Sequence, residues 1–239
     1  MELKPEKITR IVVHCSATKA DQDIGAKEID EWHKDPVKHP PKGWLMIGYH
    51  AVIRRDGHVE GGRSLNMVGS HVFGHNLYTL AICMVGGLDA NAKPEDNFTE
   101  EQYRSLGMLV TNWCATFPSI NDVCGHRDLS PDVDGDGIVE KWEWLKDCPC
   151  FSVREWQQRT LPDLFNKGDP HGANITRRYI VDRIRDFFRR YSGCCFDVNS
   201  SNRLAHLADP HADPSHQGRH DALLQGTLRG PDLVRHRAG

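Results

Sequence analysis

The sequence predicts an α/β protein in which a mixed central β-sheet is flanked by helices. Short apolar runs typical of buried strands recur through the first half of the chain, and segments with helical spacing of apolar residues lie between them. Strands that alternate with helices usually form one sheet with helices packed on its faces. The strand-like runs are residues 8–14, 49–55, 80–85 and 121–125.

The other predicted elements have local signals of their own. Asp56-Gly57 is a tight-turn dipeptide, and it predicts a hairpin that pairs residues 49–55 with residues 58–60. Thr99 and Gln102 match a capping box, in which each side chain bonds to the backbone N–H of the other residue. Apolar spacing and this box predict helices over residues 24–33, 99–117 and 153–166.

The composition is typical of a soluble globular protein. The chain has 239 residues, of which 38% are hydrophobic and 26% charged. No run of about 18 apolar residues exists, so we expect no membrane-spanning helix. Residues 1–7 lack the apolar segment of a secretory signal peptide, so we expect synthesis in the cytoplasm.

The charge distribution divides the chain near residue 166. Residues 1–165 carry 18 Lys and Arg against 25 Asp and Glu, a net charge of −7, whereas residues 166–239 carry 12 against 8, a net charge of +4. Eleven of the twelve cations in the second segment are Arg, and Glu is absent there. We therefore predict a globular domain over residues 1–166, a basic amphipathic helical extension over 167–196 and a disordered tail over 197–239.

The basic extension has three interpretations. A basic amphipathic helix can lie on an anionic membrane surface. It can equally pack on the main domain, and the residues after about 196 can lack a function. Nucleic-acid binding is not expected, because the Arg-rich segment shows no interleaved aromatic pattern.

Three candidate metal ligands stand at the ends of apolar strands or beside a proline. His14 ends the first strand, His126 follows the strand at 121–125, and Cys148 precedes Pro149. A lone histidine at a strand end is usually a structural group, but strand ends can meet at one sheet edge, where these side chains would converge. Two imidazoles and one thiolate form a zinc site that leaves a fourth position for water, as in hydrolytic zinc enzymes.

Eight cysteines are present, but free or metal-bound thiols are expected rather than disulfides because no signal peptide is seen. Cys83 and Cys114 lie in apolar stretches and are expected to be core thiols. Cys15 and Cys150 neighbour the candidate ligands, yet in extended backbone their side chains point away. We do not assign these two thiols to the metal.

Five motifs in register resemble one enzyme family. They are similar to the phage T7 lysozyme type of N-acetylmuramoyl-L-alanine amidase (amidase type 2), which shares its fold with peptidoglycan recognition proteins. The resemblance covers about residues 8–160. The motifs are VHCSAT at 13–18, GYH at 48–50, VGSH at 68–71, GHRD at 125–128 and KDCP at 146–149.

The resemblance implies roles for individual residues. Zinc would be held by His14, His126 and Cys148, and the catalytic pair would be Tyr49 and Lys146. A cationic Lys or a Tyr hydroxyl can stabilise the oxyanion of amide hydrolysis, and Tyr can also position or deprotonate the attacking water. The division of these tasks between the two residues is left open.

Two further histidines have two interpretations each. In the family fold, His50 and His71 would line the groove beside the metal and bind substrate. Each can instead be a hydrogen-bonded core histidine.

The function implied by the resemblance is that of a zinc-dependent phage or prophage endolysin, acting as a monomer on bacterial peptidoglycan. It would hydrolyse the amide between N-acetylmuramic acid and L-alanine of the stem peptide. The enzyme would be made in the host cytoplasm and act on the cell wall after release. One alternative is a non-catalytic peptidoglycan-recognition protein, which the presence of Cys148 disfavours. The other is a regulator of a phage RNA polymerase.

A calcium site is predicted between His126 and Lys146. Residues 132–143 match the twelve-residue loop of an EF-hand, with Gly137 at the sixth position, where the chain turns sharply. Calcium would rigidify this loop and so position His126 relative to Lys146 and Cys148; a solvated acidic loop is the alternative. The predicted ligands are Asp132, Asp134, Asp136, the carbonyl of Ile138, Glu140 and Glu143.

Overall fold

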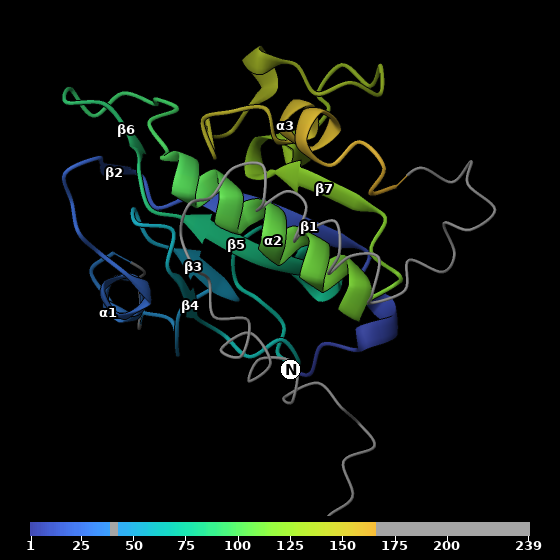
Figure 1. Cartoon of the computed structure of the whole chain (residues 1–239), viewed down its shortest axis with the longest axis horizontal. Coiled ribbons are helices and arrows are strands. Elements are labelled where there is room, and N and C mark those ends of the chain that lie inside the picture. Colours follow the sequence, from blue (N-terminus) through green and yellow to red (C-terminus); the bar gives the residue numbers. More distant parts are fainter. Residues whose placement is uncertain (39–42, 166–239) are drawn as a thin grey trace, which may run out of the picture. The chain divides into compact units, whose positions relative to one another are not determined.

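The computed structural model describes residues 1–38 and 43–165, and a five-stranded mixed sheet forms its centre (Figure 1). The strand order is β4–β3–β5–β1–β7, in which β3, β5, β1 and β7 are parallel and β4 pairs antiparallel with β3 at one edge. This sheet confirms the predicted fold class. The strands are β1 (Arg10–Cys15), β3 (Ala51–Ile53), β4 (Val59–Gly61), β5 (Thr79–Met84) and β7 (Asp122–Gly125).

The strands are continuous apolar runs because both faces of the sheet are covered. Helices α2 (Glu100–Thr116) and α3 (Val153–Thr160) pack on one face, and Figure 1 shows α2 lying across β5 and β1. Helix α1 (Ala26–Lys34) contributes Ile29 to a second core on the opposite face, together with Val52 and Cys83. The core between the sheet and α2 and α3 includes Ile11, Val13, Leu80, Ile82, Leu106, Trp113 and Trp156.

The predicted capping box begins α2 and also fastens it to the sheet. The Thr99 hydroxyl accepts from the Gln102 N–H at 3.1 Å, and the Gln102 Oε1 accepts from the Thr99 N–H at 3.1 Å. The Gln102 side chain is fully buried, and its Nε2 donates to the carbonyls of Ile53 and Val85. One side chain therefore links the helix start to β3 and to the end of β5.

The hairpin prediction is also confirmed. Strand β4 pairs with β3 through the turn at Asp56-Gly57, where Gly57 has a φ of 84°, a conformation that glycine adopts without strain. The Gly57 N–H donates to the carbonyl of Arg54 at 2.9 Å and closes this turn.

Two features differ from the expectation. Helix α3 ends at Thr160, not at residue 166, because Pro162 disfavours a helical conformation at the residue before it. A two-stranded parallel ribbon of β2 (Thr18–Lys19) and β6 (Gly87–Leu88) was not predicted, because two-residue strands carry no periodic pattern. The predicted extension at 167–196 and tail at 197–239 lie outside the described residues. Within those residues, no helix has the length and apolarity needed to cross a membrane.

Candidate metal centre and catalytic site

The sheet topology brings His14 and His126 together. His14 lies near the end of β1, and His126 directly follows β7, which pairs with β1 in parallel. Parallel neighbours end at the same edge of the sheet, so the two imidazoles meet there, with ring centroids 4.8 Å apart. Cys148 completes the group: its sulfur lies 3.9 Å from His14 Nδ1, and one ligand atom from each of the three residues lies within 4.8 Å of the others.

The donor set fits zinc. Zinc–nitrogen and zinc–sulfur bonds of about 2.1 and 2.3 Å in a tetrahedral arrangement place the two ligand atoms about 3.6 Å apart. The observed separation of 3.9 Å between His14 Nδ1 and Cys148 Sγ is close to that value. Three protein ligands leave one tetrahedral position open, which is the arrangement of a catalytic site.

Backbone contacts hold Cys148 at this edge. The N–H of Cys15 donates to the Cys148 sulfur at 3.3 Å, and the N–H of Arg127 donates to the Cys148 carbonyl at 2.9 Å. The Arg127 guanidinium pairs with Asp147 at 2.8 Å and lies over the Trp144 ring, 4.1 Å from its centroid. Arg127, the residue after one ligand, therefore positions the segment that carries another.

The electrostatic environment keeps the two imidazoles in the form that binds metal. Burial, with a further contribution from the Lys146 ammonium, lowers the pKa of His126 to about 4. Burial and the neighbouring His71 and His126 hold the pKa of His14 well below its usual value. Both rings are therefore neutral at pH 7. The neighbouring Cys15 side chain and burial raise the pKa of the Cys148 thiol, although the Cys15 backbone N–H acts in the opposite direction, so metal binding has to release this proton.

Both predicted catalytic residues lie near this centre. The Tyr49 ring packs 5.0 Å from the His14 ring, centroid to centroid, and burial raises the pKa of its hydroxyl well above the usual value. Among the described residues the Tyr49 hydroxyl has no hydrogen-bond partner. Lys146 is exposed, and its charge reaches both His14 and His126.

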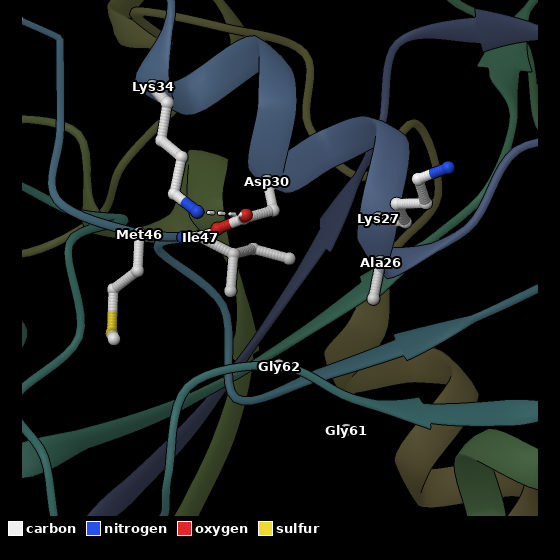
Figure 2. Close-up of a pocket in the computed structure, with 8 residues that line it drawn as sticks. All are labelled: Ala26, Lys27, Asp30, Lys34, Met46, Ile47, Gly61 and Gly62. Carbon is white, nitrogen blue, oxygen red and sulfur yellow. Dashed lines mark hydrogen bonds and ion pairs between the residues drawn. The ribbon is translucent and has the colours of Figure 1, made fainter. Parts of the chain in front are cut away.

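Helix α1 fixes the segment that leads into Tyr49. Asp30 accepts from the Ile47 N–H at 2.7 Å, and His33 Nδ1 accepts from the Gly48 N–H at 3.0 Å. Figure 2 shows Asp30, Ile47 and Lys34 at a pocket of about 360 Å³ between this helix and Gly61-Gly62. Lys34 and the Ile47 N–H both bind the Asp30 carboxylate, so this carboxylate is not free to bind a ligand in the pocket.

The structure places His50 in a core position. Its Nδ1 accepts from the Ala81 N–H at 3.0 Å, its Nε2 lies 2.9 Å from the Met67 carbonyl, and only 3% of the residue is exposed. Both ring nitrogens are therefore engaged inside the protein, which is the core alternative of the sequence analysis. A role for His50 in substrate binding stays a prediction that these contacts do not support.

His71 lies beside the metal ligands, but it contacts one of them directly. Its Nδ1 is 3.0 Å from His14 Nε2, and its Nε2 is 3.1 Å from the Thr79 hydroxyl. Substrate binding by His71 likewise stays a prediction. Sequence reasoning missed Thr79 altogether, since a threonine at the start of an apolar strand carries no signal of a role at a metal site.

The remaining thiols behave largely as expected. Cys83 is fully buried, and Cys114 is partly buried on α2. The sulfur of Cys15 lies 3.8 Å from that of Cys150, and the single S–H of Cys150 can donate to the carbonyl of either Gly87 or Asp147, at 3.1 and 3.0 Å. Neither thiol belongs to the group of three ligands.

The acidic segment at 132–143 folds as an isolated loop. Oxygen atoms of Asp132, Asp134 and Asp136 lie within 4.8 Å of one another, and those of Asp134, Glu140 and Glu143 form a second such group. The N–H of Gly137, which has a φ of 89°, donates to Asp132 at 2.8 Å. A short 3₁₀ turn at His126–Leu129 precedes the loop and a second at Lys141–Glu143 forms its last residues, so a pair of helices does not flank it.

Comparison with known proteins identifies the family of the chain. The family model for N-acetylmuramoyl-L-alanine amidase matches residues 4–149, so the chain belongs to the N-acetylmuramoyl-L-alanine amidase family. The chain is 40% identical over 153 residues to the endolysin of Enterobacteria phage K11, covering 64% of this chain and 87% of that protein. It is 37% identical over 154 residues to the endolysin of Escherichia phage T7, covering 64% and 88%.

Among solved structures, the N-acetylmuramoyl-L-alanine amidase LysC from Clostridium intestinale URNW is 26% identical, with a TM-score of 0.49. The matched region covers 66% of this chain and 89% of that one. The endolysin relatives and the family model confirm the resemblance on which the expected function rests.

Proposed function

We propose that the protein is a zinc-dependent endolysin that hydrolyses the amide between N-acetylmuramic acid and L-alanine of the peptidoglycan stem peptide. The observation that carries the proposal is the convergence of His14, His126 and Cys148 beside Tyr49, within reach of the charge of Lys146. Membership of the amidase family names the bond.

The metal ligands, Tyr49 and Lys146 have different roles in the proposed reaction. Zinc, held by His14, His126 and Cys148, would supply a Lewis acid and activate water. Tyr49 keeps its proton at neutral pH because burial raises its pKa, so it acts as a hydrogen-bond donor to the developing oxyanion and not as a base. Lys146 adds a positive charge that acts on both His14 and His126, and this charge also favours negative charge in the transition state.

Mass analysis of digested peptidoglycan tests the reaction. Purified peptidoglycan treated with the zinc-loaded protein should release free stem peptides and leave the glycan strands intact. Cys148→Ala should abolish release, whereas Cys114→Ala, which removes a partly buried thiol on α2, should leave it unchanged. Cut glycan strands would contradict the proposal.

The alternative of a non-catalytic recognition protein makes a different prediction. Such a protein would sediment with peptidoglycan and release no peptide, and its binding would not change in Cys148→Ala. The regulation of a phage RNA polymerase has no supporting contact among the described residues.

We also propose that the acidic loop binds calcium and thereby positions the residues on either side of it. Support comes from the two groups of carboxylates within 4.8 Å and from the turn at Gly137. Further support comes from Glu143, which is 5% exposed and raises the pKa of the adjacent Glu140 carboxyl. Without a cation, the carboxylates gathered in this loop repel one another.

Melting curves and peptide release with and without calcium, at constant zinc, test this second proposal. Calcium should raise the melting temperature of the wild-type protein, and the rise should be lost in Asp134→Asn. Magnesium at the same concentration is the control, since it disfavours so large a set of protein ligands. Identical curves with and without calcium would rule the site out.

The place of action follows from the proposed substrate. We propose that the enzyme is made in the host cytoplasm and reaches the cell wall after release, as a monomer. The membrane contact proposed for residues 167–196 is tested by deleting residues 167–239 and comparing lysis of whole cells with digestion of purified wall.

A further inference from the structure

A row of hydrogen-bonding side chains runs along the sheet face that carries the metal ligands. It starts at Thr79, continues through His71 and ends at His14, with heavy-atom separations of 3.1 and 3.0 Å. Thr79 is in register with Arg10, four residues before His14 on the neighbouring strand. The row therefore spans about 13 Å along the strands, the rise of four residues.

The first member of the row has a fixed direction. The Thr79 hydroxyl donates its single proton to the carbonyl of His75 at 2.9 Å, so towards His71 Nε2 it can only accept. Thr79 is fully buried, which leaves no water to satisfy either group in its place.

The direction of the first hydrogen bond determines which nitrogen carries the proton in each of the two histidine rings. A neutral imidazole carries one N–H and one lone pair. When His71 Nε2 donates to Thr79, His71 Nδ1 presents its lone pair to His14 Nε2, which must then carry the proton of His14. The lone pair of His14 is left on Nδ1, the nitrogen that faces the Cys148 sulfur at 3.9 Å.

The opposite direction would block the metal site. If Thr79 donated to His71, then His71 Nδ1 would carry its proton and donate to His14 Nε2. The proton of His14 would then lie on Nδ1, and this nitrogen could not bind a metal. The choice between the two arrangements is made at the His75 carbonyl, far from the metal.

We propose that Thr79 is a positioning residue that acts through His71 to fix the metal-binding tautomer of His14. The proposal rests on the proposed zinc site. It gives His71 a role behind a ligand, since both of its ring nitrogens are engaged within the row.

The loop between β4 and β5 is built to hold His71 in this position. The Asn76 side-chain oxygen accepts from the N–H groups of His71 and Val72 at 2.9 and 3.0 Å. The N–H of His75 donates to the Val72 carbonyl at 3.1 Å, which folds the loop back so that the His75 carbonyl reaches Thr79. The loop thus supplies both the ring and the acceptor that orients it.

Three variants test the role of Thr79. Thr79→Val keeps the shape and removes the hydroxyl, Thr79→Ser keeps the hydroxyl, and Thr111→Val removes a threonine hydroxyl on α2 that bonds only to the Gly107 carbonyl. Zinc affinity is measured by competition with a fluorescent chelator. Outer partners of ligating histidines typically contribute 10–100-fold to metal affinity, so we expect that loss in Thr79→Val and less than a threefold change in the other two.

A second measurement reads the tautomer directly. In the zinc-free wild-type protein, nitrogen NMR of the histidine rings should show the proton of His14 on Nε2, and Thr79→Val should mix the two tautomers. A wild-type His14 protonated on Nδ1 would overturn the proposal without any variant, and so would unchanged zinc affinity in Thr79→Val. If the wild type binds no zinc or releases no stem peptide, the proposed function fails instead. The tautomer of His14 in the zinc-free protein still tests whether the hydrogen bonds from Thr79 through His71 have the proposed direction.

Discussion

Mild acid should destabilise the metal-free protein before its carboxylates begin to titrate. Four histidines near the metal site have a pKa below the ordinary value, with burial as the main cause in each: His14, His50, His71 and His126. For His50 and His126 the pKa falls to about 4. Between that value and about 6.5, the unfolded chain binds more protons than the folded one, so stability is lost as the pH falls through this window.

His50 sets the scale of the effect, because it is only 3% exposed and is not itself a proposed ligand. With a pKa of about 4 in the folded state and about 6.5 in the unfolded state, proton linkage removes about 2 kcal/mol of stability between about pH 7 and pH 5. A domain of this kind has about 5–15 kcal/mol in total. The other three histidines act in the same direction, so the loss should be easily measurable.

The assay is urea unfolding followed by tryptophan fluorescence at pH 7, 6 and 5, with a chelator present throughout. His50→Gln should reduce the dependence of the unfolding free energy on pH by close to one proton, even though the variant is less stable at every pH. His58→Gln, which changes an exposed histidine, is the matched control and should keep the wild-type slope. Constant or rising stability of the chelated wild type from pH 7 to pH 5 would refute the reasoning.

Three further predictions concern single side chains. Tyr49→Phe should lower stem-peptide release at least about 100-fold, as loss of a positioned proton donor does, with zinc content unchanged; loss of zinc would instead indicate a structural role. Gln102→Leu should reduce the unfolding free energy by about 3 kcal/mol, because it removes four side-chain hydrogen bonds in the core, and a urea midpoint equal to that of wild type would contradict this. Arg127→Ala should weaken zinc binding about tenfold in a chelator competition, whereas Arg104→Ala, a change on α2, should not.

Much of the scaffold could be predicted from the sequence because its signals are local. The strand at 8–14 and the helix that begins after Thr99 depend on apolar runs and on a capping pair three residues apart. The group of His14, His126 and Cys148 could be predicted because the two histidines lie at the ends of buried strands and the cysteine precedes a proline. Signals of this kind depend on residues that are close together in the sequence, so they can be recognised without knowing the tertiary packing.

The contacts that refine the site could not be predicted in the same way. Thr79 reaches His14 only through His71, and this depends on the register of two strands and on the shape of the loop around Asn76. The burial of both His50 nitrogens likewise depends on Ala81 and Met67, which are distant in sequence. Such contacts are set by tertiary packing, and no spacing in the sequence encodes them.

The separation of two proposed metal ligands along the chain has a consequence for how the domain unfolds. His14 and Cys148 are 134 positions apart, so an ion bound between them would act as a cross-link that closes a loop containing nearly all of the domain. Closing a loop of this length restricts the unfolded chain by about as much as a disulfide does, roughly 4–5 kcal/mol. Removal of the ion should therefore loosen the segment before α3 first, and protease cuts within residues 130–150 should mark the metal-free form.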